Sequence, residues 1–371
     1  MTSFNDTFKR TSMNRRRFLA AGTGVAATLA APRVARSQSA VRELRMTTAW
    51  PKNSAGLGAN AQRLADMINA MSGGRLQVRV FAAGELVPAL AAFDAVSDGR
   101  AEMMHTTPHF AAGKNPVFRF FGNVPFGLTA HEHAGWLRFG GGQALWEEAY
   151  AKAGVQPLLA GTTGPQAGGW FKKEIKSADD LKGLKMRAGG MGRDVLVRLG
   201  VDAILTPPGE IAAAMASDRL DAVEWNGPWN DREAGLHKLA SYYYMPGVLE
   251  IGPMLEASIN KGVFMSLSPD LQEVIGRAAT ASAFETYSDF TYHNAVNYEI
   301  LLKDGVQMRT FPADVVRAKA QATEAILREI AQQSEFNKRV YDSFVSYRKA
   351  ASRYAEVSDL AQLQARQQVL S

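Results

Sequence analysis

The sequence predicts an α/β protein of two lobes, each built on a mixed, mostly parallel sheet. Strand-like and helix-like patterns alternate from residue 42 onward, which favours parallel strands with helices on both faces of each sheet. The length of 371 residues suits two domains of ordinary size, and hydrophobic residues at 46% supply an ample core. The absence of cysteine from the sequence excludes disulfides, thiolate metal sites and a cysteine nucleophile.

The first half begins with a strand, a helix and a second strand. Leu44–Trp50 and Leu76–Phe81 are short apolar or alternating runs that predict strands. Between them lie apolar residues at helical spacing, and Ser72-Gly73-Gly74 ends that helix. The helical positions are Ala61, Leu64, Ala65 and Ile68. The second half repeats this alternation, with strands predicted at Leu184–Ala188 and Ala203–Leu205 and helices at Val195–Leu199 and Ile211–Ser217.

Two segments of equal length, 88–102 and 207–221, align without a gap. Each predicts a helix that begins after proline, a turn with an arginine, and an acidic residue that opens a strand. The identities are Pro88 with Pro207, Ala95 with Ala214, and Arg100 with Arg219. With so few identities, coincidence between two ordinary helix–strand units is the simpler interpretation, and a duplication is the alternative.

A duplication would place the carboxyl ends of two equivalent strands on opposite walls of a cleft. These strands are Ala101–Thr107 and Asp221–Trp225. Ligands of open α/β sheets bind at such strand ends. One wall would then carry His105-Thr106-Thr107 and the other Glu224-Trp225-Asn226.

The pattern changes after Pro253. Leu255–Leu267 is consistent with a strand that returns between the lobes, and Ser268-Pro269-Asp270 begins a helix with proline at its first position. The sequence from Ala313 to Leu370 is almost continuously helical. An apolar stripe in this region either packs across the protein itself or reaches a second protomer, so the sequence allows a homodimer through these helices. The stripe consists of Val340, Phe344, Tyr347 and Tyr354.

Residues 1–37 have the order of a removable export signal. A basic segment, Asn14-Arg15-Arg16-Arg17-Phe18-Leu19, precedes an uncharged apolar stretch that is too short to span a bilayer comfortably. Ala35-Arg36-Ser37 follows as a cleavage-like site. The arginine pair resembles the twin-arginine consensus, although Asn14 stands where Ser or Thr is usual. These features predict a periplasmic protein exported through a twin-arginine-type signal.

The positive charge of the chain comes from this segment. The formal net charge is +6, and residues from Gln38 onward carry equal numbers of basic and acidic side chains. A neutral body lacks the electrostatic footprint of a nucleic-acid-binding protein, so no nucleic-acid partner is expected.

The sequence carries no motif of a known enzyme class. No Gly-x-Ser-x-Gly elbow and no Gly-x-x-x-x-Gly-Lys loop occur. His131-Glu132-His133 lacks the spacing of paired metal ligands, and a proline between His105 and His109 argues against a helix there. Gly140-Gly141-Gly142, before a predicted helix at Gln143–Ala153, is interpreted as a hinge or a helix start.

Several residues suit the binding of a small carboxylate. Arg187 ends a predicted strand beside two glycines that allow close ligand approach, and its guanidinium matches a carboxylate with two parallel bonds, although a surface arginine is the alternative. Glu224–Trp229 places a carboxylate and two indoles around a turn, where the tryptophans could equally cover the core. Thr162–Trp170 is a polar, glycine-rich crossover between the lobes.

These segments resemble the solute-binding proteins of TRAP transporters, in the branch that binds 2-oxo acids and lactate. The resemblance covers about residues 42–340 and rests on motifs in family order. These motifs are Gly164-Pro-Gln166-x-Gly-Gly-Trp170-Phe, Leu181-Lys-Gly-Leu-Lys-Met-Arg187 and Asp221-Ala-Val-Glu224-Trp225-Asn226-Gly227-Pro228. The resemblance implies the two-lobed periplasmic binding protein fold, a hinge cleft, and delivery of an organic anion to a membrane permease.

The resemblance also implies roles for individual residues. Arg187 would hold the substrate carboxylate, with further substrate contacts from Gln166, Asn226, Thr107 and Trp225. Gln166, Glu224 and the main-chain oxygen of Trp225 would bind sodium or calcium, because their oxygen atoms suit a hard cation. Where relatives often carry paired aromatics, this chain has His109-Phe110, so a tyrosine hydroxyl contact is expected to be missing.

The predicted function is therefore capture of a small 2-oxo or 2-hydroxy monocarboxylate together with a metal ion, without catalysis. Arg187 and one sodium ion would balance Glu224 and one carboxylate, which favours a monoanion. The alternatives are a dicarboxylate or sugar-acid binder of the same class, or an exported metal-dependent enzyme. We expect lobe 1 at residues 42–163 and about 256–290, lobe 2 at 164–255 and about 291–335, and a helical extension at 336–371.

Overall fold

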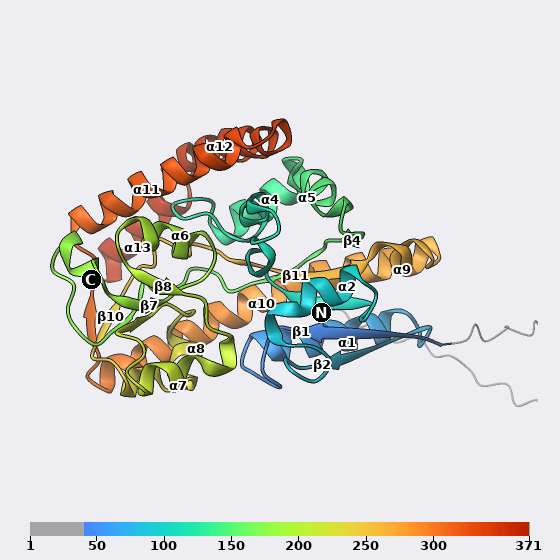
Figure 1. Cartoon of the computed structure of the whole chain (residues 1–371), viewed down its shortest axis with the longest axis horizontal. Helices are drawn as coiled ribbons and strands as arrows, with labels where there is room; N and C mark the ends of the chain where they lie inside the picture. Colours follow the sequence, from blue (N-terminus) through green and yellow to red (C-terminus); the bar gives the residue numbers. More distant parts are fainter. Residues whose placement is uncertain (1–40, 371) are drawn as a thin grey trace, which may run out of the picture. The chain divides into compact units, whose positions relative to one another are not determined.

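Two mixed sheets organise the chain in a computed structural model that describes residues 41–370 (Figure 1). The expected signal segment, residues 1–37, lies outside the described residues. The first sheet has the order β2-β1-β3-β11-β4, and β5 also pairs with β11. Its strands are β1 (Arg42–Thr48), β2 (Leu76–Phe81), β3 (Met103–Thr106), β4 (Val155–Gln156), β5 (Leu159–Thr162) and β11 (Met254–Asn260).

The second sheet has the order β12-β10-β6-β9-β7-β8. Its strands are β6 (Gly169–Phe171), β7 (Lys185–Arg187), β8 (Asp202–Ile204), β9 (Ala222–Val223), β10 (Tyr242–Tyr244) and β12 (Gln307–Arg309). Of the strand pairings in residues 41–370, five are parallel and five antiparallel. Both sheets are mixed as predicted, but parallel pairing does not predominate, because β11 joins the first sheet antiparallel to three strands.

The helices of the two halves agree with the predicted alternation. Those before β11 are α1 (Leu57–Met71), α2 (Ala92–Ser97), α3 (Arg119–Gly122), α4 (Ala130–Phe139), α5 (Gly142–Ala151), α6 (Gly190–Arg198), α7 (Ile211–Ala216) and α8 (Pro228–Glu233). The glycine run at 140–142 proves to be a helix start, because α5 begins at Gly142 with Gly141 in the left-handed conformation at φ 82°. The predicted strand at Leu255–Leu267 is shorter, since β11 ends at Asn260 and a short helix, α9 (Lys261–Met265), follows.

The chain crosses between the two sheets through three segments. Residues 163–168 join β5 to β6, residues 245–253 join β10 to β11, and the long helix α10 (Pro269–Lys303) leads back from the first sheet to β12. As predicted, α10 begins with proline at its first position. In Figure 1 it runs along both groups of elements, contacting α1 and β5 on one side and α8 on the other.

The C-terminal region is helical as predicted. Its helices are α11 (Ala313–Gln332), α12 (Glu335–Ala355) and α13 (Asp359–Leu370). Phe344 of α12 is buried and packs edge-on against Trp136 of α4 and Phe120 of α3, whereas Tyr354 is 71% exposed. The stripe therefore packs against the protein at its start and is open at its end. None of the helices within residues 41–370 combines the length and the apolar character needed to cross a membrane.

The two aligned segments fold alike. Each has a 3₁₀ turn, a six-residue helix and a strand: η1 (Ala89–Ala91), α2 and β3 in one, and η5 (Pro208–Glu210), α7 and β9 in the other. Pro88 has φ −54° and ψ 149°, and Pro207 has φ −54° and ψ 145°.

The acidic residues that open the two strands also bond alike. Arg45 N donates to Glu102 Oε2 at 2.8 Å, and Lys185 N donates to Asp221 Oδ2 at 3.0 Å. The structural match is thus more extensive than the three sequence identities.

Candidate ligand-binding site

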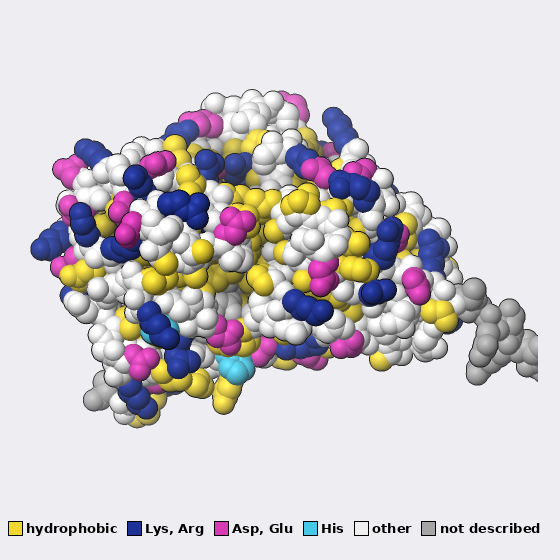
Figure 2. Space-filling model, turned by 60° about the horizontal axis from the view of Figure 1, so that its bottom comes forward, with side chains coloured by type: hydrophobic (Ala, Val, Ile, Leu, Met, Phe, Trp, Pro, Cys, Tyr) yellow, Lys and Arg dark blue, Asp and Glu magenta, His cyan; other side chains and the backbone are white. Residues whose placement is uncertain are grey.

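A small cavity of about 30 Å³ lies where the two sheets face each other, and it brings together all six sequence-predicted site residues. These are Thr107, Gln166, Arg187, Glu224, Trp225 and Asn226. The space-filling view of one face shows hydrophobic side chains gathered in its middle, with charged side chains on both sides of them (Figure 2). The lining also includes Trp50, His109, Phe110, Thr163 and Glu250.

Strand ends and one crossover position the predicted residues. Thr107 directly follows β3, and Glu224 directly follows β9, so the ends of the two equivalent strands contribute one residue each. Arg187 is the last residue of β7, which runs parallel to β9. Glu224 N donates to Arg187 O at 2.9 Å and thereby extends this pairing into the cavity. Gln166 lies on the crossover 163–168.

Arg187 is a buried guanidinium held by the main chain. It is 2% exposed, and its Nη1 donates to the main-chain oxygen of Glu224 at 2.5 Å. The same Nη1 lies 3.5 Å from Glu224 Oε2, and the guanidinium carbon lies 5.0 Å from the ring centre of Trp225. Burial lowers the pKa of Arg187, which Glu224 and Glu250 oppose. Its Nε has no hydrogen-bond partner within the described residues. A carboxylate ligand would supply the missing acceptor.

Two carboxyl groups share the cavity with Arg187. Burial raises the pKa of Glu224, which Arg187 opposes. Burial and the nearby Glu224 raise the pKa of Glu250 well above its ordinary range. Neither oxygen of Glu250 has a hydrogen-bond partner among residues 41–370. Sequence reasoning missed Glu250, because it lies in the crossover 245–253, where no periodicity marks it.

Three oxygen atoms face one another beside these groups. Gln166 Oε1 lies 2.9 Å from the main-chain oxygen of Trp225 and 3.0 Å from Glu224 Oε1. On the other side of the amide, Nε2 donates to Thr163 Oγ1 at 2.9 Å and to Asn226 Oδ1 at 2.8 Å. Three acceptors without a proton between them repel one another unless a cation lies among them. Amide, carboxylate and carbonyl oxygens are the donors that sodium and calcium prefer, so this set fits the implied metal ion.

A buried aspartate fixes the turn that carries two of the predicted residues. Asp231 Oδ1 accepts from Asn226 N at 3.0 Å, and Oδ2 accepts from Trp170 Nε1 at 3.0 Å and from Tyr243 OH at 2.9 Å. The rings of Trp170 and Tyr243 stack with centres 4.0 Å apart. Burial raises the pKa of Asp231 to about 6, which these hydrogen bonds oppose. These hydrogen bonds hold the turn through contacts within the protein alone.

The two histidines of the first wall differ in position. His109 lines the cavity, where Thr107 Oγ1 lies 3.0 Å from its Nδ1. Burial, with Arg187 and Arg119 nearby, lowers the pKa of His109 to about 3, so the imidazole is neutral at pH 7. His105 was expected on this wall, and that expectation is wrong: it lies in the core, where its Nδ1 accepts from Trp50 Nε1 at 2.8 Å.

Within residues 41–370, no group of three or more His, Asp or Glu side chains is arranged to hold a metal ion. The set around Gln166 instead combines one amide oxygen, one carboxylate oxygen and one main-chain oxygen.

Two lobes that enclose a small cavity with a buried guanidinium and a set of facing oxygens define a two-lobed binding protein for a small ligand. The model of the family "Bacterial extracellular solute-binding protein, family 7" (DctP) matches residues 46–334. The chain belongs to this family.

Similar proteins of known ligand share most of the chain. It is 39% identical to the monocarboxylate 2-oxoacid-binding periplasmic protein of Nostoc sp., covering 85% of this chain and 87% of that protein. It is 37% identical, with a TM-score of 0.85, to a TRAP periplasmic solute-binding protein from Colwellia psychrerythraea with bound calcium and pyruvate, covering 88% and 99% of the two chains. A protein of the same kind from Pseudoalteromonas atlantica, with bound sodium and pyruvate, is 35% identical with a TM-score of 0.85, covering 87% and 99%.

Proposed function

We propose that this chain is the extracytoplasmic solute-binding subunit of a TRAP transporter. It captures a small 2-oxo or 2-hydroxy monocarboxylate with a sodium or calcium ion and delivers it to the membrane permease. The observation that carries the proposal is the convergence of Arg187 with the three facing oxygens of Gln166, Glu224 and Trp225 in one buried cavity. The pyruvate bound to two similar solved structures supports the ligand class.

Each residue has a separate part in this proposal. Arg187 binds the ligand carboxylate, and the oxygens of Gln166, Glu224 and Trp225 hold the cation. The cation attracts the ligand and screens it from Glu224. Asn226 and Thr107 supply further polar contacts from the two walls.

Charge balance favours a monocarboxylate over the dicarboxylate alternative. Arg187 and a sodium ion neutralise Glu224 and one carboxylate, whereas a second ligand carboxylate would add an unpaired charge to a buried site. The cavity of about 30 Å³ also favours a compact ligand over a sugar acid. In this role the protein binds and releases its ligand without chemical change, as distinct from an exported metal-dependent enzyme.

The proposal extends to the arrangement of the chain. Lobe 1 comprises residues 42–163 and about 256–290, lobe 2 comprises 164–255 and about 291–335, and the extension comprises 336–371; membership of the two sheets supports this division.

A twin-arginine-type signal at residues 1–37 exports the protein, so replacing Arg15 and Arg16 by lysine should leave uncleaved precursor in the cytoplasm. Normal export of that variant would contradict the twin-arginine assignment.

A homodimer is proposed through α13. This helix has no buried residue, and it leaves a row of apolar side chains open to solvent. This row consists of Leu360, Leu363 and Leu370, with exposures between 47% and 79%, whereas Val369 lies on the opposite face. An exposed apolar helix face of this kind is typical of an interface with a second chain.

Two measurements test the proposed function. Mass spectrometry of small molecules released from the denatured protein should detect a 2-oxo or 2-hydroxy monocarboxylate. Calorimetric titration with pyruvate, lactate and succinate, in calcium, in sodium and in chelator, should show that a monocarboxylate binds tightly only with a cation. Tight succinate binding in chelator would contradict the ligand class, and conversion of the ligand during incubation would favour the enzyme.

A further inference from the structure

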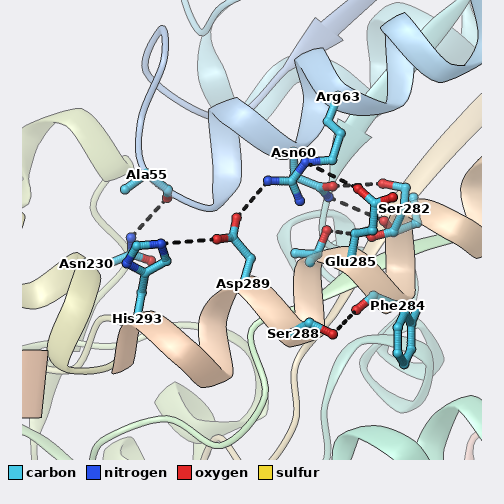
Figure 3. Close-up of polar contacts among 12 residues, drawn as sticks. Ala55, Asn60, Arg63, Asn230, Ser282, Phe284, Glu285, Ser288, Asp289 and His293 are labelled. Carbon is cyan, nitrogen blue, oxygen red and sulfur yellow. Dashed lines mark hydrogen bonds and ion pairs between the residues drawn. The ribbon is translucent and has the colours of Figure 1, made fainter. Parts of the chain in front are cut away.

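Three side-chain amides form a hydrogen-bonded chain that leads away from the cavity. Gln166 Nε2 donates to Asn226 Oδ1 at 2.8 Å, and Asn226 Nδ2 donates to Asn230 Oδ1 at 2.9 Å. Asn230 Nδ2 donates to the main-chain oxygen of Ala55 at 2.9 Å (Figure 3). Gln166 and Asn226 line the cavity, whereas Asn230 lies in α8 and Ala55 lies just before α1. All three amide side chains are buried.

The far end of the chain determines the direction of every bond in it. A main-chain oxygen can only accept, so Asn230 must present its nitrogen to Ala55. Its oxygen then faces Asn226, which must present its own nitrogen. The oxygen of Asn226 consequently faces Gln166, whose nitrogen must donate to it. The remaining atom of the amide, Gln166 Oε1, is left facing Glu224 and Trp225.

A second contact favours the same orientation of Gln166. The hydroxyl of Thr163 donates to the main-chain oxygen of Gly164 at 3.2 Å, so Thr163 Oγ1 accepts from Gln166 Nε2 at 2.9 Å. The opposite orientation has an attraction of its own, because the nitrogen would then donate to Trp225 O and to Glu224 Oε1. That orientation would fill the cation site with a donor. Two opposing sets of hydrogen bonds therefore determine the orientation of the Gln166 amide. The Asn226–Asn230–Ala55 chain favours the orientation in which Oε1 faces the cation site.

The helices on both sides of the Ala55–Asn230 bond are hydrogen-bonded to α10. Asn230 belongs to α8. The preceding residue of that helix, Trp229, donates its main-chain N–H to Asn294 Oδ1 of α10 at 3.0 Å. On the other side, Arg63 of α1 bonds to Asp289 of α10 at 2.8 Å (Figure 3). Helices α1 and α8, which flank the Ala55–Asn230 bond, are thus both bonded to the same long helix.

We propose that Asn230 is a positioning residue for the cation site, and that it turns the side-chain oxygen of Gln166 toward the cation through Asn226. Asn230 itself touches neither the cation nor the organic acid. The inference rests on the proposed function, since it presupposes the cation site of Gln166, Glu224 and Trp225. It adds Asn230, which does not line the cavity, to the residues on which cation binding depends.

A double-mutant cycle separates orientation from packing. Asn230→Leu removes the anchor, and we expect calcium affinity, measured by titration without organic acid, to fall on the order of tenfold, because one or two hydrogen bonds no longer bias the amide. Gln166→Glu presents an oxygen in either orientation of its side chain. In the Gln166→Glu background, Asn230→Leu should therefore change calcium affinity less than about twofold.

Two further variants control for the loss of a buried amide in general and for misfolding of Asn230→Leu. Asn297→Leu removes another buried amide, one that accepts from Arg232 of α8 at 3.3 Å, and should leave calcium affinity unchanged. Serine is too short to reach both Asn226 and Ala55, and because it is smaller than asparagine it does not overpack the site. Asn230→Ser should therefore reproduce the loss, and it serves as the test if Asn230→Leu fails to fold.

The outcomes distinguish the two proposals. Equal losses of calcium affinity in both backgrounds, or an equal loss in Asn297→Leu, would overturn the positioning role and leave the cation site standing. Wild-type protein that binds neither calcium nor sodium would overturn the cation site and the positioning role with it. A loss confined to the Gln166 background supports the proposal.

Discussion

The Arg187 guanidinium bonds to the main-chain oxygen of Glu224 at 2.5 Å, closer than the 3.5 Å that separates it from the Glu224 carboxylate. The main chain, rather than the ion pair, therefore fixes the arginine. This arrangement leaves the carboxylate free for another partner and the arginine Nε without an acceptor in the described residues. A cation beside Glu224 would balance its charge, and a ligand carboxylate beside Arg187 would supply the acceptor that its Nε lacks.

Arg187→Lys should weaken monocarboxylate binding. Lysine cannot form two parallel bonds to a carboxylate, so the loss should be roughly 1.5–3 kcal/mol, the scale of a hydrogen bond to a charged group. Calorimetry with pyruvate in calcium buffer measures it. Arg193→Lys is the matched control, because Arg193 donates to the main-chain oxygen of Ala203 at 2.9 Å and does not line the cavity. Unchanged affinity in Arg187→Lys would show that Arg187 does not hold the ligand.

Glu224→Gln should make ligand binding weaker in calcium and nearly insensitive to chelator. The substitution keeps an oxygen for the cation but removes its charge, so cation affinity falls. In chelator the wild type places an unscreened carboxylate beside the ligand, and the variant does not. Pyruvate titrations of both proteins, with calcium and with chelator, test this. If wild-type affinity ignores the cation, Glu224 instead acts as a hydrogen-bond acceptor for the ligand or as a structural partner of Arg187.

Local patterns carried much of the prediction for this chain. The strand at Leu76–Phe81 and the helix that begins at Pro269 follow from side-chain period and capping, which depend on neighbours in sequence. The six predicted site residues stand at strand ends or on a crossover, where motif and topology agree. Conversely, the predominance of parallel pairing was wrong, because the partners of β11 depend on contacts that no local pattern encodes.

Long-range contacts also explain the residues that were missed or misplaced. His105 lies in the core because Trp50, 55 residues earlier, donates to it. Glu250 reaches the cavity because its main-chain oxygen accepts from Gln166 N at 3.1 Å. Both contacts join segments that are far apart in sequence, so neither periodicity nor spacing could predict them.

Gly169→Ala should destabilise the protein and disturb the site. Gly169 has φ 117°, and an added Cβ would lie 2.6 Å from the main-chain oxygen of Val223, the residue before Glu224. Backbone overlap in addition to a strained φ should cost more than about 2 kcal/mol of unfolding free energy. Gly183→Ala is the matched control, with φ 72° and open space around its Cβ, and should cost about 1 kcal/mol. Urea unfolding compares them; equal costs would contradict the close approach at Val223.

Glu256→Gln should remove part of the pH dependence of stability. Glu256 is fully buried on β11, where it accepts from Ser258 Oγ at 2.5 Å and from Tyr150 OH at 3.2 Å. Burial raises its pKa from 4.5 to about 7, despite these hydrogen bonds. Between pH 4.5 and 7 the folded protein therefore keeps a proton that the unfolded chain has lost, so the contribution of Glu256 to stability declines as pH rises through this window.

The full decline corresponds to roughly 3 kcal/mol by pH 8. Since glutamine does not titrate, the unfolding free energy of Glu256→Gln should rise relative to that of the wild type between pH 4.5 and 8 by about this amount. Urea unfolding at several pH values measures the difference in unfolding free energy between the two proteins. The contributions of the other buried groups cancel in this difference, because both proteins share them. Glu273→Gln, on the exposed part of α10, should follow the wild type throughout. Parallel curves for wild type and Glu256→Gln would mean that Glu256 is ionised in the folded protein at pH 5, and that its two hydroxyl partners outweigh its burial.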